Sequence, residues 1–506
     1  MNENLFETFR TRFPEDRLTT FIETGDGKIL SYTDLETISG KMARLLLDLG
    51  VTKGDRVMVQ VEKSAEAIFL YLACLRAGAV FLPLNTAYQA GEVDYFVSDA
   101  EPTVFVCTPD TEQLVSEITA RNGIPNLLTL GINSDGTLVE QSQNLEPISG
   151  CVEVAADDMA AILYTSGTTG RSKGAMLSHE NLRSNALTLH QVWGWQKDDV
   201  MLHALPIFHT HGLFVATNCV LANGTGMIFL TKFDIDKILT LLPRSTVYMG
   251  VPTHYVRMLG HADLNVKICS NMRLFISGSA PLLEETFTEF QSRTGHTILE
   301  RCGMTESGMN TSNPLTGKRI AGTVGLPLPG VEIRICDNDG NQLPNGENGG
   351  LEIRGPNVFS GYWRMPEKTA EEFRDDGFFI TGDVACIDPD TGYLSIVGRD
   401  KDMIITGGFN VYPKEIELII DEIDGIGESA VIGLSHPDFG EAVAAVATRS
   451  NGSQTDPESV IKTVKQQLAN FKVPKQVFLV DELPRNAMGK VQKNVLRDNY
   501  KDTFTS

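Results

Sequence analysis

Strand-like and helix-like segments alternate through most of the first 300 residues, and no other feature limits the possible folds as strongly. Several short runs are rich in β-branched and aromatic residues: RVMVQV (Arg56–Val61), TVFVCT, MAAILYT, GMIFLT, STVYMGV and MRLFISG. A longer helical or loop segment follows each run, beginning with an apolar helical pattern from Ala65. This alternation predicts an α/β protein whose layers are built on mainly parallel sheets.

The composition and the secondary-structure pattern of the sequence change twice further along the chain. From about residue 320, dense Gly and Pro with short strands predict a small β-rich subdomain over 320–400. From Lys401 onward, helical and strand patterns alternate in a small α+β unit. We therefore predict a large N-terminal domain of layered α/β subdomains over 1–400 and a small, mobile C-terminal domain over 401–506, with a hinge near 399–402.

Charge and composition exclude several classes of protein. The chain has 43 Lys and Arg against 65 Asp and Glu, a formal net charge of -22. We expect no nucleic-acid partner, because affinity for phosphate backbones comes from cationic side chains. Apolar residues make up 42% and charged residues 21%, which is typical of a soluble enzyme and excludes a disordered chain, a collagen and a coiled-coil rod.

The sequence contains no clear candidate for membrane insertion. Its most apolar stretch, AIFLYLACLRAGAVFLPL from Ala67, is broken by Arg76 and Pro83 before the ~20 residues that a span needs. The N-terminal MNENLFETFRTRFPEDR lacks the apolar core of a secretory signal. The eight cysteines are scattered without a CxxC pair, which predicts free thiols. We expect a cytoplasmic protein without a membrane partner, and its oligomeric state stays open.

A loop of small residues, TSGTTGRSKG (Thr165–Gly174), follows the strand-like run MAAILY. A helix is predicted after it, with Ser178 as the N-cap. Glycines and short hydroxyl side chains let backbone N–H groups approach phosphate oxygens, and a lysine adds a positive charge. The spacing differs from GxxxxGK[ST], which excludes an ordinary P-loop. The predicted phosphate-binding residues are Thr165, Ser166, Gly167, Thr168, Thr169, Gly170 and Lys173.

This loop is one of seven segments that resemble the adenylate-forming superfamily, which contains acyl-CoA synthetases, luciferases and the adenylation domains of peptide synthetases. The other segments are LPIFHTHGL (Leu205–Leu213), SGSAPL (Ser277–Leu282), GMTE (Gly303–Glu306), TGD (Thr381–Asp383), GRDKDMIITGGFNVYPKEIE (Gly398–Glu417) and PRNAMGK (Pro484–Lys490). They occur in the order of the superfamily and span nearly the whole chain. Each segment alone is a weak signal, but all of them in order are specific.

The resemblance implies a two-step reaction with ATP, Mg²⁺ and coenzyme A. A carboxylate attacks the α-phosphate of ATP, which gives an acyl-adenylate and pyrophosphate, and a thiol then displaces AMP. Thr305 and Glu306 match the positions that contact phosphate and magnesium, and one carboxylate with phosphate oxygens suits Mg²⁺. Lys490 matches the lysine that bridges the substrate carboxylate and the α-phosphate during adenylation.

The same resemblance implies roles for other residues around the nucleotide. Asp383 and Arg399 match contacts to the ribose, and His209 matches a residue at the mouth between the ATP and acyl pockets. Superfamily members usually carry an aromatic residue before GMTE, where it stacks on adenine, but this chain has Cys302. Two interpretations are open: other residues hold adenine, or ATP binds more weakly. The predicted adenine site comprises Ser279, Ala280, Pro281, Cys302, Gly303 and Met304.

The resemblance also implies that the small domain rotates between the two half-reactions. Lys401 matches the hinge of that rotation. The rotation would withdraw Lys490 and present the face formed by Gly407 and Gly408, whose lack of side chains allows close approach to the pantetheine arm of coenzyme A.

The acid substrate is indicated by a closer similarity. ERCGMTESGMNTSNP, HTHGLFVATN and GYWRMPEKT are similar to the malonyl-CoA synthetase subfamily, which implies malonate as the acid. Arg301 offers a physical reason, because its guanidinium can bind a second carboxylate with two hydrogen bonds. The alternative is that Arg301 is exposed or pairs with Glu300. Thr210 and Met309 are expected to limit the depth of the pocket, so that methylmalonate fits better than longer branches.

Several other functions stay open at this point. A ligase of the same superfamily could act on a fatty, aryl or short monocarboxylic acid, and a substrate panel separates these acids. An adenylation domain for a carrier protein and a luciferase-like oxidase are further alternatives. A nucleotide-binding regulator without catalysis would bind ATP and release no pyrophosphate, but Lys173, Glu306, Asp383 and Lys490 argue against it.

Overall fold

The computed structural model of the chain describes residues 2–165, 172–280, 282, 284–337, 339–399, 403–411, 413–450, 453–484 and 491–504. Contacts between residues divide the chain into two units. The first unit contains Met1–Thr86, Val97–Leu163 and Gly174–Gly398, and the second contains Ala87–Phe96, Tyr164–Lys173 and Arg399–Ser506. The predicted division into 1–400 and 401–506 stays a prediction.

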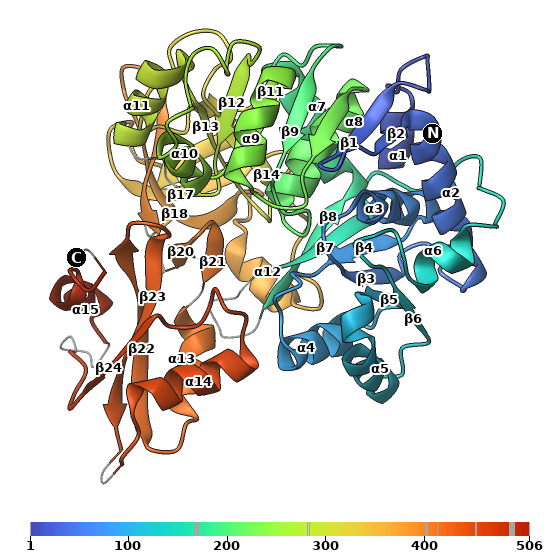
Figure 1. Cartoon of the computed structure of the whole chain (residues 1–506). Coiled ribbons are helices and arrows are strands. Elements are labelled where there is room, and N and C mark those ends of the chain that lie inside the picture. The colour runs from blue at the N-terminus through green and yellow to red at the C-terminus, as the bar shows by residue number, and fades with distance from the viewer. Residues whose placement is uncertain are drawn as a thin grey trace. The chain divides into compact units, whose positions relative to one another are not determined.

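One sheet of the first unit has the strand order β15-β14-β13-β12-β11-β9-β10-β1-β2, and Figure 1 shows β9, β11 and β12 side by side. The pairings from β1 through β10, β9, β11 and β12 to β13 are parallel. Antiparallel strands extend the sheet at both ends. The strands are β1 (Thr20–Thr24), β2 (Ile29–Ser31), β9 (Val200–His203), β10 (Gly226–Phe229), β11 (Val247–Gly250), β12 (Leu274–Ser277), β13 (Leu299–Met304), β14 (Gly308–Ser312) and β15 (Leu326–Pro327).

A second sheet has the order β6-β5-β3-β4-β7-β8, and its pairings from β6 to β7 are parallel. The last two strands of this order flank the predicted phosphate loop along the chain. The strands are β3 (Arg56–Gln60), β4 (Val80–Pro83), β5 (Val104–Cys107), β6 (Asn126–Thr129), β7 (Met159–Thr165) and β8 (Lys173–Ser178). Together the two sheets confirm the predicted α/β class with mainly parallel strands.

Several helices begin at residues whose side chains cap the helix, among them Asn4 before α1, Ser31 before α2 and Ser64 before α3. Ser178 and Asn181 form a capping box at the start of α7, which confirms the predicted N-cap. The apolar stretch that begins near Ala67 forms α3, all of whose residues are buried. The helices of this part of the chain are α1 (Leu5–Arg10), α2 (Tyr32–Asp48), α3 (Ala65–Ala77), α4 (Ala90–Ala100), α5 (Glu112–Arg121), α6 (Thr137–Ser142), α7 (His179–Val192), α8 (Asn218–Asn223), α9 (Ile235–Leu241), α10 (Pro252–Leu259) and α11 (Glu284–Thr294), with short 3₁₀ helices η1 (Pro109–Thr111) and η3 (Leu242–Arg244).

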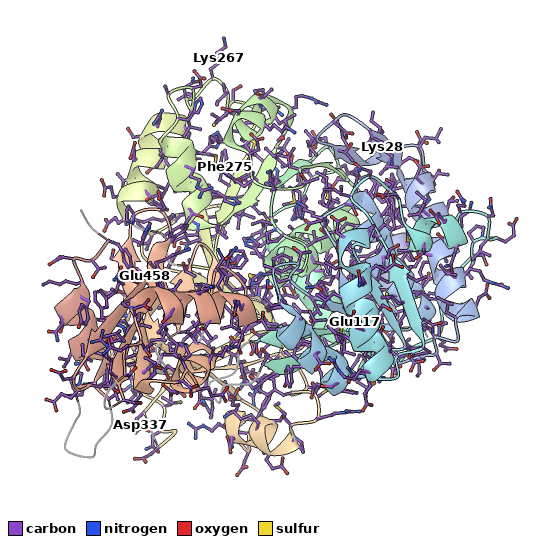
Figure 2. The ribbon with its side chains drawn as sticks, turned by 60° about the horizontal axis from the view of Figure 1, so that its bottom comes forward. Lys28, Glu117, Lys267, Phe275, Asp337 and Glu458 are labelled. Carbon is purple, nitrogen blue, oxygen red and sulfur yellow. The ribbon has the colours of Figure 1, made fainter. Side chains whose placement is uncertain are left out.

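Phe275 and Lys267 illustrate how an apolar and a charged side chain are placed in the first unit. Phe275 on β12 is fully buried between β11 and β13 and packs edge-on against Phe290 of α11. Figure 2 shows Phe275 among other side chains, whereas Lys267 reaches away from the protein. Among the described residues, no helix is both long enough and apolar enough to span a lipid bilayer.

A third sheet is antiparallel where its register is described, and it forms the Gly- and Pro-rich region of the first unit. Its order is β16-β17-β18-β19. The elements are β16 (Glu332–Cys336), β17 (Gly349–Arg354), β18 (Phe379–Ile387) and β19 (Leu394–Arg399), with α12 (Pro366–Glu372) between β17 and β18 along the chain. This sheet confirms the β-rich character predicted for the region.

The second unit is an α+β arrangement with its own apolar core, as predicted for the C-terminal part of the chain. Strands β22 and β23 form a long antiparallel pair, and β24 joins β23 in parallel. The elements are β20 (Ile404–Thr406), β21 (Phe409–Val411), β22 (Ile426–His436), β23 (Gly440–Arg449), β24 (Gln476–Val480), α13 (Pro413–Asp421), α14 (Pro457–Gln467) and α15 (Lys493–Tyr500).

A buried ion pair ties the segment Ala87–Phe96 into the second unit. Lys472 is 2% exposed, and its Nζ lies 2.7 Å from Glu92 Oε1 and 2.8 Å from Glu415 Oε1. The same ammonium lies over the ring of Tyr88. The flanking carboxylates outweigh burial and raise the pKa of Lys472, so the lysine stays charged.

Glu300 on β13 is a buried acid of the first unit, and no cationic side chain pairs with it among the residues that the structure describes. Leu282 donates its backbone N–H to Glu300 Oε1 at 3.3 Å, and Oε2 has no hydrogen-bond partner among the described residues. Burial raises the pKa of Glu300 from 4.5 to about 7, although the amides of Leu282 and Gly322 act in the opposite direction. The carboxyl group therefore holds a proton at mildly acidic pH.

We predict that Glu300→Gln stabilises the protein as pH rises. Between pH 4.5 and 7 the folded chain keeps a proton on Glu300 that the unfolded chain has lost, so wild-type stability falls with rising pH. The neutral amide avoids this loss, which amounts to roughly 3 kcal/mol at about 1.4 kcal/mol per pKa unit. Melting temperatures measured from about pH 5 to about pH 8 should show a widening advantage of the variant.

The control is Glu289→Gln, since that carboxylate is 53% exposed. It makes the same chemical change at a carboxylate that is not buried. An advantage of Glu300→Gln that stays constant over the same range would contradict the raised pKa of Glu300.

Candidate active site

The predicted acyl and adenine residues come together where β12 and β13 end. These strands pair in parallel, with Ser277 opposite Glu300. The segment Gly278–Ala280 therefore leaves the sheet beside Arg301 and the residues that follow it. Ser279 has a left-handed backbone, with φ of 72°. Ligands of α/β proteins bind at the carboxyl ends of parallel strands, so this edge is the expected place for a site.

Arg301 is the charge at the centre of this edge. It is 3% exposed, and its Nε and Nη2 have no hydrogen-bond partner within the described residues. A Cβ on Gly278 would lie 2.3 Å from Arg301 Cζ, so only glycine leaves room for the guanidinium. Burial lowers the pKa of Arg301 to about 10, and the side chain stays charged at neutral pH. Arg301 makes no ion pair with Glu300, because successive residues of a strand face opposite sides.

Two histidines lie near this charge and are neutral at pH 7. Burial, together with the charge of Arg301, lowers the pKa of His209 to about 4 and that of His211 well below 6.5. His211 Nδ1 lies 3.2 Å from Ser279 Oγ, and its Nε2 has no hydrogen-bond partner among the described residues. His209 Nδ1 accepts the backbone N–H of His211 at 3.2 Å. The histidines therefore add polar groups to the site without adding positive charge.

A buried lysine fixes the loop that carries these histidines through two successive hydrogen bonds. Lys63 Nζ lies 2.9 Å from His203 Nδ1, and His203 Nε2 lies 2.9 Å from the carbonyl oxygen of Gly212. Gly212 belongs to a π-helical turn, η2 (His211–Thr217). A Cβ on Gly212 would lie 2.0 Å from the carbonyl oxygen of Pro206, so the loop can fold back only at a glycine.

Thr210 and Met309 are both buried in this region, as expected for side chains that limit a pocket. Thr210 Oγ1 and Ser277 Oγ are buried without a hydrogen-bond partner among the described residues. The side-chain amide of Asn185 accepts a hydrogen bond from the backbone N–H of Met309 on β14 and donates one to the backbone carbonyl oxygen of Met309. A Cβ on Gly303 would lie 2.4 Å from Met309 Cε, so the methionine side chain lies against the turn after β13.

Glu306 is a buried carboxylate at the far end of the same turn. It is 6% exposed, and Tyr362 donates its phenolic hydrogen towards Oε1 at 3.1 Å. Phe359 fixes its backbone by donating an N–H to the carbonyl oxygen at 2.7 Å. Burial and the charges of Glu306 and Glu372 raise the pKa of the Tyr362 phenol, which stays protonated.

The residues around Glu306 fit a magnesium ion that is held mostly by its nucleotide. Among the described residues, no group of three His, Cys, Asp or Glu side chains could enclose a metal. A single oxygen donor such as Glu306 suits Mg²⁺ when phosphate oxygens and water complete the shell. Thr305, which is partly exposed, supplies a neighbouring hydroxyl.

The nucleotide residues are described to different extents. Asp383 is buried on β18, and its N–H donates to Thr381 Oγ1 at 3.1 Å. Lys173 is buried at the start of β8, where its carbonyl oxygen accepts the hydroxyl of Thr165. Arg399 ends β19, and its backbone alone is described. Ala280, Cys302 and Met304 are partly exposed. The predicted residues Ser166, Gly167, Thr168, Thr169, Gly170, Pro281, Lys401 and Lys490 lie outside the described residues.

Gly407 and Gly408 form the turn between β20 and β21 in the second unit. Their φ angles are 56° and 84°, which favour glycine. Gly407 donates its N–H to the carbonyl oxygen of Phe439 at 2.9 Å. The predicted pantetheine face is thus a tight turn without side chains, and its role stays a prediction.

Sequence reasoning missed Tyr362, Glu372 and Ser277 as parts of this site. Tyr362 and Glu306 are separated by 56 positions, and no spacing rule links them. GYW was noted only for its subfamily similarity. The motif residues marked the strand ends, but their buried partners became visible only in three dimensions.

Comparison with known proteins shows the family of the chain. The family model of the AMP-binding enzyme matches residues 6–363, and that of the AMP-binding enzyme C-terminal domain matches residues 415–490. A malonate–CoA ligase of Arabidopsis thaliana is 33% identical over 99% of this chain and 90% of its own length. A feruloyl-CoA synthase of an Amycolatopsis species is also 33% identical, over 94% of both chains.

A solved structure is closer in sequence. The ATP-bound MatB of Rhodopseudomonas palustris is 55% identical, covers 100% of both chains and superposes with a TM-score of 0.79. These matches confirm the resemblance to the adenylate-forming superfamily. The family model of the AMP-binding enzyme covers well over half of the residues of this chain. The chain therefore belongs to the AMP-binding enzyme family.

Proposed function

We propose that the chain is an AMP-forming acyl-CoA synthetase that converts malonate, ATP and coenzyme A to malonyl-CoA, AMP and pyrophosphate through a malonyl-adenylate. The observation that carries this proposal is the buried guanidinium of Arg301, whose Nε and Nη2 lack partners among the described residues. The 55% identity to MatB and the malonate–CoA ligase relative support the same acid.

A dicarboxylate suits Arg301 for an electrostatic reason. A buried charge without a partner is costly, and a carboxylate can meet a guanidinium with two parallel hydrogen bonds. Malonate holds its two carboxylates one methylene apart. One carboxylate can therefore pair with Arg301 while the other is presented to the α-phosphate. A monocarboxylate leaves the guanidinium unpaired.

The other polar groups of the acyl site favour a small polar acid. Thr210 Oγ1, Ser277 Oγ and His211 Nε2 are buried and available for hydrogen bonds within the described part of the chain. Thr210 and Met309 limit the depth, so that methylmalonate is accepted and longer branches are excluded. His209 lies between the acyl side and the nucleotide side as a neutral gate.

The nucleotide is held by residues that the superfamily resemblance assigns. Thr305 and Glu306 hold the magnesium ion, which offsets phosphate charge, and Asp383 and Arg399 bind the ribose. Lys490 offsets the negative charge that accumulates during attack on the α-phosphate. The phosphates bind at the loop formed by Thr165, Ser166, Gly167, Thr168, Thr169, Gly170 and Lys173, and adenine binds against Ser279, Ala280, Pro281, Cys302, Gly303 and Met304.

The two half-reactions require different groups close to the α-phosphate. Adenylation uses Lys490 and excludes water, whereas thioester formation needs a path for the pantetheine thiol. A rotation about Lys401 would withdraw Lys490 and bring the Gly407–Gly408 turn to the pantetheine arm.

The first test is pyrophosphate release with ATP, Mg²⁺ and coenzyme A across a panel of acids. We expect malonate to give the highest kcat/KM, followed by methylmalonate, with succinate, acetate, octanoate and ferulate far lower. Preference for a monocarboxylate would keep the family reaction and remove the role of Arg301. ATP binding without pyrophosphate release for any acid would favour a nucleotide-binding regulator.

Replacement of Arg301 tests the residue directly. Arg301→Met keeps a long side chain but removes the cation. We expect kcat/KM for malonate to fall, with a loss of transition-state stabilisation of about 2–5 kcal/mol. Acetate should lose far less, because it does not use the guanidinium.

Arg293→Met is a matched control. Its guanidinium donates to the backbone carbonyls of Leu259, His261 and Leu264, and it should keep the malonate-to-acetate ratio of wild type. An unchanged ratio in Arg301→Met would take Arg301 out of the acyl site.

Lys490→Ala separates the half-reactions. We expect pyrophosphate release from malonate and ATP to be abolished, whereas thioester formation from supplied malonyl-adenylate and coenzyme A is retained. Rapid-quench measurement of both steps checks this. Equal losses in the two steps would show that Lys490 does not act specifically in adenylation.

A further inference from the structure

The phenol of Tyr362 lies between two carboxylates. Its Oη is 3.1 Å from Glu306 Oε1 and 2.7 Å from Glu372 Oε2. Tyr362 is 3% exposed, so water has little access to this group. A phenol has one hydrogen to donate, and the two carboxylates therefore compete for the same hydrogen bond.

The position of the phenol is fixed by the strand that follows the phosphate loop and by α12. Ala175 of β8 forms a β-bridge with Tyr362, and Met176 donates its N–H to the carbonyl oxygen of Gly361 at 3.0 Å. The N–H of Tyr362 donates to Thr369 Oγ1 of α12 at 2.9 Å. Gly361 has φ of 138°, and a Cβ there would lie 2.5 Å from Thr369 Cγ2. The tyrosine therefore has little freedom to move.

Glu372 is held in place independently of Glu306. Lys368 Nζ lies 3.2 Å from Glu372 Oε1, one turn earlier on α12, while Oε2 accepts the phenol. Both oxygens of Glu372 are thus engaged. Glu306 has the longer of the two distances to the phenol, so its hydrogen bond to the phenol is the weaker of the two.

We propose that Tyr362 is a positioning residue for the magnesium carboxylate, with Glu372 as the acceptor that keeps its hydrogen bond when Glu306 turns to the ion. The proposal rests on the role of Glu306 stated under the proposed function. Before the ion arrives, the phenol holds Glu306 in one orientation. Once Glu306 turns, the phenol donates to Glu372, and no buried donor is left without an acceptor.

The test measures ATP binding without acid and coenzyme A, so that turnover does not contribute. Calorimetric titration of ATP at graded Mg²⁺ gives the Mg²⁺ concentration for half-maximal binding. Tyr362→Phe keeps the ring but removes the hydrogen bond that Glu306 gives up on turning to the ion, and we expect this concentration to fall about fivefold. Glu372→Ala leaves the phenol without an acceptor once Glu306 turns, and we expect the concentration to rise about tenfold.

The double variant shows whether Tyr362 and Glu372 act through one hydrogen bond or have two separate structural effects. If Tyr362 and Glu372 act through the same hydrogen bond, Tyr362→Phe/Glu372→Ala should need no more Mg²⁺ than Tyr362→Phe alone. Independent effects on packing would multiply instead, and that result would overturn the proposal. Unchanged Mg²⁺ dependence in both single variants would also overturn it.

Two further variants complete the design. Tyr32→Phe is the matched control, because Tyr32 is fully buried and donates to the carbonyl oxygen of Thr225 at 2.7 Å; its Mg²⁺ dependence should equal wild type. Glu306→Gln tests the metal assignment itself. Unchanged Mg²⁺ dependence in Glu306→Gln contradicts the proposed role of Glu306, whereas a rise there without a fall in Tyr362→Phe contradicts only the positioning role. If Tyr362→Phe does not fold, Glu372→Ala alone decides.

Discussion

The buried positive charge of Arg301 is the interaction on which the rest of the acyl site depends. Gly278 leaves space for the guanidinium, and the neighbouring His209 and His211 are held neutral by burial and by that same charge. A charge in such a place is stable only if the surroundings add no second cation and a ligand supplies an anion. The loop after β12 and the π-helical turn therefore provide hydroxyl and imidazole groups.

The end of β13 and the turn after it connect two regions of opposite electrostatic character. Arg301 lies within the strand, and Glu306 with Tyr362 and Glu372 lies at the turn. A short piece of chain thus carries a cation for an organic anion and a carboxylate for a metal–nucleotide complex. The two substrates of an adenylation reaction are both anionic, and this separation gives each of them its own compensating charge.

The sequence allowed the α/β class and the N-cap at Ser178 to be predicted, because periodicity and capping are local properties. Arg301 could be proposed from its neighbours, but its burial depends on Gly278, which follows the adjacent strand β12. Tyr362 could not be found in this way, since its contact with Glu306 arises from the pairing of β8 with a distant segment. The pairing of Lys472 with Glu92 depends likewise on a contact across most of the chain.

Adjacent residues of β13 carry opposite chemistry: Glu300 faces a region where it holds a proton, and Arg301 faces the acyl site. The side of the strand on which each charge falls is set by the pairing of Ser277 with Glu300. A shift of one residue would exchange the two faces and place an acid where the substrate anion is expected. An insertion or deletion between α11 and β13 that shifted this register would therefore reverse the charge of the pocket. The register of β13 is thus part of what sets the charge that the acid meets.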